Sequence, residues 1–187
     1  MGAWGITALE SDAGLDVIDF IRKHLPEDGV VRLEDIINSI QADEWLKPFD
    51  VKDGLSSSSP QAVAELVMLY SDQEEAKLDF DGEWAKNDNK FGAITSFTAS
   101  RETIQWIRDY LSDTLKYAVD NAAASTNDRL SFGKWGGWFE KEDWIGWQEH
   151  MSRLVTRLDG LLQSSQDDRI DLSPQQEPGN SLTIQNN

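Results

Sequence analysis

The chain has 187 residues, 39% of them hydrophobic and 27% charged, a composition typical of a globular domain with a sizeable core. Asp and Glu number 34 against 17 Lys and Arg, so the net charge is −17, and a field of this sign disfavours binding to nucleic acid or to an anionic membrane. Cysteine is absent, which excludes disulfides, thiolate metal sites and cysteine nucleophiles.

The first half of the chain predicts three helices. Asp12, or alternatively Ser11, is a plausible N-cap for a helix that reaches about His24. The second helix follows from apolar residues spaced i, i+3, i+4 and i+7, namely Leu33, Ile36, Ile37 and Ile40. Ser59 as N-cap, with Pro60 at the first helical position, starts a third helix. That helix is apolar on nearly every side and is therefore predicted to be central and buried.

The second half predicts a long connection and two more helices. Residues 79–97 lack a clean period and are predicted to form an irregular connection with room for a short hairpin. Ser100 caps a fourth helix through about Asn121, with a stripe formed by Ile104, Ile107, Leu111, Leu115 and Val119. Residues 142–162 form a fifth, whose apolar positions are Trp144, Trp147, Met151, Leu154, Leu158 and Leu161. Period-2 alternation is scarce, so the predicted fold class is all-α, a compact array of about five helices.

Residues 1–162 are predicted to form this helical domain, and residues 163–187 a flexible polar tail. The tail is rich in Ser, Gln, Asn and Pro and has too few apolar residues to order itself. It carries four acidic residues and one basic residue, so −14 of the −17 charge belongs to the domain. Residues 1–13 lack the basic and apolar regions of a signal peptide, and no apolar run approaches the roughly 20 residues of a membrane helix. We therefore expect a cytoplasmic protein.

The irregular connection holds a cluster of carboxylates that is a candidate partner-binding site: Asp79, Asp81, Glu83 and Asp88. Its start resembles a calcium-binding loop, but Trp84 stands where glycine is needed and Lys90 where a bidentate glutamate is needed. Two alternatives remain, an acidic recognition patch on a loop and a merely solvated loop.

Tryptophan is the second unusual feature, with eight residues in the chain. Trp144 and Trp147 lie on the predicted fifth helix and are expected to pack in the core. Trp135 and Trp138 lie among glycines just before it, and this spacing fits both core packing and an exposed binding surface. They are therefore also candidate partner-binding residues.

No catalytic, metal or cofactor site is predicted. The two histidines, His24 and His150, do not form an i, i+4 pair, so each is expected to have a surface or helix-terminal role. The chain has neither a Gly-x-Ser-x-Gly nucleophile motif nor a glycine-rich phosphate loop.

The N-terminus reads Met1-Gly2-Ala3-Trp4-Gly5, followed by Glu10-Ser11-Asp12-Ala13 and Asp16. This pattern resembles a family of uncharacterised bacterial proteins that begin Met-Gly-Xaa-Trp-Gly and reach an Asn/Ser-Asp helix start. The resemblance extends over about residues 1–162 through the order of the later helices and the tryptophan segment. It implies a small, mostly helical domain and supplies no activity and no functional residue. In physical terms, the two glycines are expected to let the Trp4 indole pack against the helices.

These observations favour a stoichiometric binding protein of the bacterial immunity-protein type, which neutralises a basic partner such as a toxin. Charge complementarity speeds the capture of a basic protein, and aromatic anchors slow its release. The alternative is a hydrolase that depends on a divalent metal held by carboxylates from facing helices. A scaffold or oligomer subunit is a third possibility.

Overall fold

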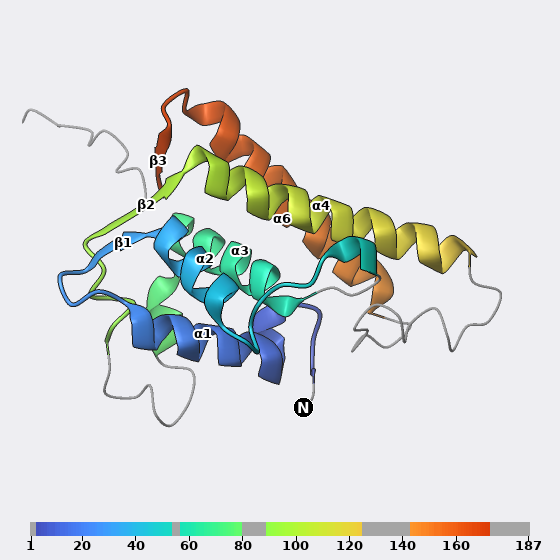
Figure 1. The fold of residues 1–187 in the computed structure, drawn as a ribbon, viewed down its shortest axis with the longest axis horizontal. Coiled ribbons are helices and arrows are strands. Elements are labelled where there is room, and N and C mark those ends of the chain that lie inside the picture. Colours follow the sequence, from blue (N-terminus) through green and yellow to red (C-terminus); the bar gives the residue numbers. More distant parts are fainter. Residues whose placement is uncertain (1–2, 54–56, 80–88, 125–142, 173–187) are drawn as a thin grey trace, which may run out of the picture.

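The computed structural model describes residues 3–53, 57–79, 89–124 and 143–172. Within these ranges the protein is mostly helical, with one small three-stranded sheet (Figure 1). The α-helices are α1 Asp12–His24, α2 Leu33–Ala42, α3 Ser58–Ser71, α4 Arg101–Ala124 and α6 Trp144–Ser164. The other elements are the 3-10 helices η1 Ala8–Glu10, η2 Val51–Asp53 and η3 Glu75–Asp79 and the strands β1 Val30–Arg32, β2 Ser96–Ser100 and β3 Arg169–Asp171.

The first two predicted helices are confirmed, and the cap of α1 is Ser11 and not Asp12. The hydroxyl of Ser11 accepts a hydrogen bond from the backbone N–H of Gly14 at 3.0 Å. A side chain at Gly14 would collide with the carbonyl oxygen of Ala8, so glycine allows η1 to lie directly on the first turn of α1. Helix α2 begins at Leu33 and buries all four apolar residues that define its predicted face.

Helix α3 is the central helix, as its apolar composition predicts. Every residue from Ser59 to Met68 is buried, and the helix contacts α1, α4 and α6. Its N-cap is Ser57, so the predicted cap at Ser59 is wrong. The Ser59 hydroxyl instead donates a hydrogen bond to the carbonyl oxygen of Leu46 at 2.6 Å, which ties the segment after α2 to the start of α3.

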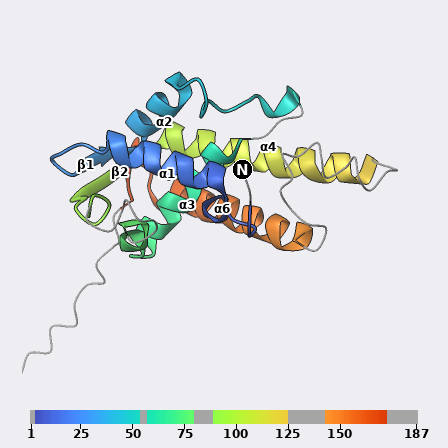
Figure 2. The same ribbon diagram turned by 90° about the horizontal axis from the view of Figure 1, so that it is seen from below.

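Helices α4 and α6 pack against each other and form the long axis of the molecule (Figures 1 and 2). The buried stripe of α4 begins as predicted at Ile104 but continues through Thr114 and Ala118, whereas Val119 is 41% exposed. After Ile107 the predicted stripe advances in three successive steps of four residues. Three such steps rotate by about 120° around a helix, so the stripe leaves the inner face.

The sheet corrects the all-α prediction. Strand β1 pairs in parallel with β2, with Val31 opposite Phe97, and β2 pairs antiparallel with β3, with Ala99 opposite Ile170. The outer two strands have three residues each, too few to show an alternating pattern in the sequence. Gly29 makes the turn before β1 with a left-handed φ of 70°, and its carbonyl oxygen accepts a hydrogen bond from the N–H of Thr95 at 2.9 Å.

Strand β3 also corrects the predicted start of the tail. Residues 163–172 are part of the fold, because α6 continues to Ser164 and the chain then returns along β2. The side chains of Ile170 and Leu172 are 2% and 1% exposed, and the Leu172 N–H donates to the carbonyl oxygen of Phe97 at 2.9 Å. Residues 173–187, the rest of the predicted tail, lie outside the described residues.

An ion pair fastens β3 to the start of α2. The guanidinium of Arg169 lies 2.9 Å from the carboxylate of Glu34, which also accepts a hydrogen bond from the N–H of Ser100 at 3.1 Å. Burial by itself raises the pKa of Glu34. Hydrogen bonds from the backbone of Glu34 and Ser100 and the charge of Arg169 outweigh it, so the net pKa lies below its ordinary value of 4.5.

If β3 belongs to the core, Ile170→Ala will lower the free energy of unfolding by about 2–5 kcal/mol, because it opens a cavity beside β2. Urea denaturation measures this loss. The matched control is Val119→Ala, a truncation at a 41% exposed position, which we expect to change stability by about 0.5 kcal/mol at most. Equal effects of the two substitutions would contradict the packing of β3.

Glu34→Gln keeps an oxygen for the Ser100 N–H but removes the charge that attracts Arg169. The folded-state pKa of Glu34 is depressed, so the ionised carboxylate contributes its full stabilisation above pH 4.5, and this stabilisation is lost as the pH falls through the lower folded-state pKa. At neutral pH we expect the free energy of unfolding of the wild type to exceed that of the variant by about 1 kcal/mol. Unfolding measured across a pH series should show this difference disappear in acid. A difference that does not change with pH would contradict the ion pair's role.

Candidate functional site

The structure places one of the six candidate partner-binding residues, and it lies in the interior. Asp79 is 3% exposed, and its carboxylate pairs with the Arg22 guanidinium at 2.9 Å. The same carboxylate accepts hydrogen bonds from the N–H groups of Phe91 and Gly92 at 3.1 and 2.7 Å. Asp79 therefore joins α1, η3 and the segment before β2, and it does not face solvent. The other five candidates lie outside the described residues: Asp81, Glu83, Asp88, Trp135 and Trp138.

The predicted core packing is confirmed for the tryptophans of α6 and is wrong for Trp4. Trp147 is 4% exposed, as predicted, and Trp144 is half-buried and stacks on it with ring centroids 5.4 Å apart. The expected packing of Trp4 is wrong, because its side chain is 61% exposed. The backbone of Trp4 and Gly5, and not the Trp4 indole, contacts the rest of the fold. The Trp4 N–H donates to the carbonyl oxygen of Glu10 at 2.9 Å, and Gly5 lies so close to the Glu10 carboxylate that a side chain there would collide with it.

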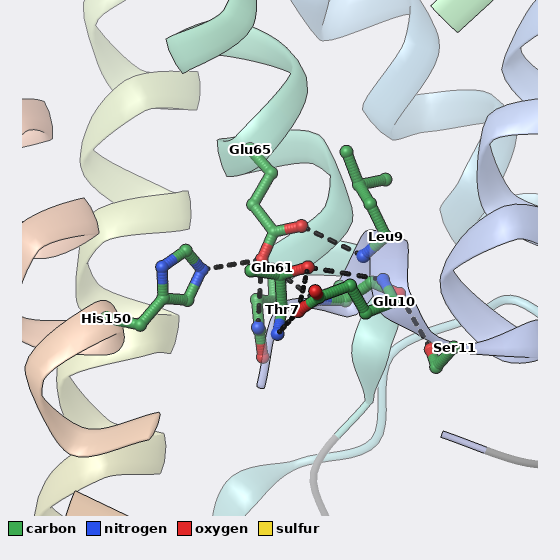
Figure 3. A network of polar contacts seen from close by, with 8 residues as sticks. Thr7, Leu9, Glu10, Ser11, Gln61, Glu65 and His150 are labelled. Atoms are coloured by element: carbon green, nitrogen blue, oxygen red, sulfur yellow. Dashed lines mark hydrogen bonds and ion pairs between the residues drawn. The ribbon is translucent and has the colours of Figure 1, made fainter. Parts of the chain in front are cut away.

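A buried polar network centres on Glu65 in α3 (Figure 3). Its Oε1 accepts hydrogen bonds from the Ala8 N–H at 2.9 Å, the Gln61 amide at 3.0 Å and His150 Nε2 at 2.7 Å. Its Oε2 accepts one from the Leu9 N–H at 3.0 Å. Because a carboxylate only accepts hydrogen bonds, His150 Nε2 carries the proton that faces it. The network thus joins η1, α3 and α6.

The Glu65–His150 pair has the composition of an acid–base dyad, but its surroundings make it structural. The two side chains are 6% and 13% exposed, and the donors around Glu65 are backbone and side-chain groups of the fold itself. The predicted surface or helix-terminal role of His150 is therefore wrong, since its ring lies in the interior contact between α6 and α3. For His24 the prediction is confirmed, because its exposed ring lies at the end of α1 and contacts the Phe20 carbonyl oxygen at 2.8 Å.

An open cleft of about 790 Å³, lined by described residues, runs along the outer face of α4. One wall is α4 between residues 106 and 120, and the other is the segment 47–52, which runs alongside that helix after α2 (Figure 2). We call it the α4 cleft. Its volume is in the range of ligand and peptide sites in proteins.

The helical repeat divides the α4 wall of the cleft into two stripes. One stripe is aromatic and consists of Trp106, Tyr110 and Tyr117. The other is charged and consists of Asp109, Asp113, Lys116 and Asp120. The facing segment adds Phe49, which is 56% exposed. Trp45, four residues earlier in the chain, is 90% exposed and lines a neighbouring hollow to which Phe49 also contributes. The site therefore combines exposed aromatic surface with carboxylates.

Tyr110 holds the two walls together. Its hydroxyl donates to the carbonyl oxygen of Phe49 at 3.1 Å and accepts from the N–H of Ser57 at 3.1 Å. Burial raises the pKa of Tyr110; hydrogen bonding with Ser57 opposes the rise and the negative charge of Asp50 adds to it, so the net shift is upward. The hydroxyl consequently keeps its proton and its bond to Phe49 at neutral pH.

No group of three or more His, Asp and Glu side chains in the described part of the chain is placed to hold a metal ion. None of its helices combines the length and the apolar character needed to cross a bilayer.

Comparison with known proteins gives no match: no protein family, no curated protein and no solved structure is significantly similar to this chain. The similarity of the N-terminus to an uncharacterised bacterial family stays a prediction.

The network around Glu65 predicts that Glu65→Gln lowers the free energy of unfolding by about 1–3 kcal/mol, because the new amide N–H₂ faces donors and leaves one of them unsatisfied. Glu149→Gln, the same change at an exposed position on α6, is the control and should have little effect. Both are measured by urea denaturation at neutral pH. If the two variants are equally stable, the network does not hold the helices together.

Proposed function

We propose that this protein is a stoichiometric binding domain that neutralises a basic partner protein, in the manner of a bacterial toxin-immunity protein. Its contact surface is the α4 cleft together with Trp45 and Phe49. The observation that carries the proposal is the exposure of two large aromatic residues four positions apart, Phe49 in the wall of the cleft and Trp45 before it, together with the exposed carboxylates on the α4 wall. The proposal places the protein in the cytoplasm, where such an inhibitor would meet a newly made partner.

Exposed aromatic side chains support this function because they cost free energy in water and regain it when a partner covers them. Trp45 and Phe49 lie only four residues apart and expose 90% and 56% of their side chains. Tryptophan is among the residues most enriched at the energetic centres of protein interfaces. A standard interface buries about 800 Å² on each partner. The cleft, Trp45 and Phe49 would form the centre of such an interface, and surrounding surface would supply the rest of the buried area.

The charge supports the choice of a basic partner. The net charge of −17 attracts a positively charged protein over long distances at low ionic strength. Near the contact, Asp113 and Asp120 of the cleft have no ion-pair or hydrogen-bond partner among the described residues. A cationic partner therefore gains their attraction without breaking an existing pair.

The alternative, a hydrolase built on a carboxylate-held metal, remains a prediction. No observation on the described residues favours it over binding.

The proposal is tested by purifying this protein with the product of the adjacent gene and titrating the two in a calorimeter at low and high ionic strength. We expect one-to-one binding that weakens as salt is added. Trp45→Ala and Phe49→Ala should each weaken it by about 30-fold, the effect of a typical central interface residue.

Leu15→Ala on α1 and Val30→Ala on β1 are the controls, because both truncate exposed apolar side chains away from the cleft. Retained affinity in both aromatic variants would refute the assigned surface. Absence of binding at either ionic strength would refute the pairing with that gene product, and a tight partner that carries no net positive charge would refute the charge argument.

A further inference from the structure

The α4 cleft has a chemical polarity that indicates which group it receives. On α4, the charged stripe is purely acidic at its N-terminal end, at Asp109 and Asp113, and the lysine of that stripe, Lys116, comes a turn later. Two further lysines, Lys47 and Lys52, lie on the opposite wall. A cation in the cleft is therefore directed to the α4 wall, toward the end where Trp106 lies.

At that end an aromatic platform lies beside the carboxylates. The rings of Trp106 and Tyr110 are 5.8 Å apart between centroids and tilted by 38°. Asp113 follows Tyr110 by three residues, so it lies on the same face of α4 within one helical turn of the platform. The hydroxyl of Tyr110 is already bonded to Phe49 and Ser57, which fixes this part of the platform in place.

The carboxylates of Asp109 and Asp113 differ in whether they already have a charged partner. Asp109 lies 3.0 Å from the guanidinium of its neighbour Arg108, which also approaches Asp159 of α6 at 3.5 Å. Asp113 is exposed and has no ion-pair or hydrogen-bond partner among the described residues. Asp113 is thus the carboxylate that can bond an incoming cation directly, while Asp109 adds negative charge.

We propose that the α4 cleft is a receptor for an arginine side chain, whose guanidinium stacks on the Trp106–Tyr110 platform and pairs with Asp113. Arginine fits this arrangement because its planar guanidinium can lie on an aromatic face while its in-plane N–H groups bond a carboxylate. The compact ammonium of lysine has no such plane. The inference rests on the proposed function, in that the arginine belongs to the basic partner.

The test uses the full chain and needs no partner, so it can fail while the proposed function holds, and the reverse. The probe is Nα-acetyl-arginine methylamide, titrated while NMR follows the indole N–H of Trp106, assigned by comparison with Trp106→Phe. We expect a saturable shift of that signal. The neutral citrulline analogue and the lysine analogue should each bind at least about tenfold more weakly.

The double substitution Asp109→Asn and Asp113→Asn should weaken binding of the arginine probe by at least about tenfold. The matched control, Asp35→Asn with Glu149→Gln, removes the same charge from exposed positions outside the cleft and should leave the affinity unchanged. Urea denaturation establishes that both double variants remain folded. The proposal is overturned if the arginine probe gives no saturable shift, if citrulline or lysine binds equally well, or if the two double variants bind alike.

Discussion

Glu65 places a carboxylate in the middle of the apolar helix α3, where it accepts hydrogen bonds from η1, from Gln61 and from α6. A buried carboxylate without partners is costly, so each donor is held in position by the need to satisfy it. Through these bonds Glu65 ties η1 and α6 to the central helix, while Gly14 lets η1 lie on the first turn of α1. Because α4 packs along α6, the outer face of α4 is presented on a fixed support.

That outer face gives the molecule its chemical character. The inner stripe of α4 is apolar, whereas the face it turns to the cleft is half aromatic and half charged. Tyr110 fixes the opposite wall, so Phe49 is held across the cleft from the carboxylates of α4, and the exposed Trp45 lies four residues before it in the chain. A rigid surface of this kind loses little conformational entropy on binding, and this favours recognition of a preformed partner.

Helix periodicity in the sequence predicts α1, α2, α3 and most of α4 and α6, because each buries a face long enough to repeat. Short-range patterns cannot find contacts made across the fold. Strand β3 shows only Ile170 and Leu172 in a polar segment, and their burial depends on β2, about seventy residues away. From the sequence Asp79 is expected to be a surface carboxylate, because its buried partner, Arg22 of α1, lies far away in the chain. The α4 cleft cannot be predicted from the sequence either, because it forms only where segment 47–52 runs alongside the outer face of α4. The one sequence feature that indicates it is the helical spacing of Trp106, Tyr110 and Tyr117.

The central claim is that a partner covers the aromatic side chains beside the α4 cleft. Hydroxyl-radical footprinting of the free and fully bound protein tests it most directly, with oxidation of Trp45 and Phe49 measured by mass spectrometry. The account predicts that oxidation of both residues slows severalfold in the complex, while Ile145, which is 67% exposed on α6 and outside the cleft, reacts as before. Unchanged oxidation of Trp45 and Phe49 in a saturated complex would contradict it.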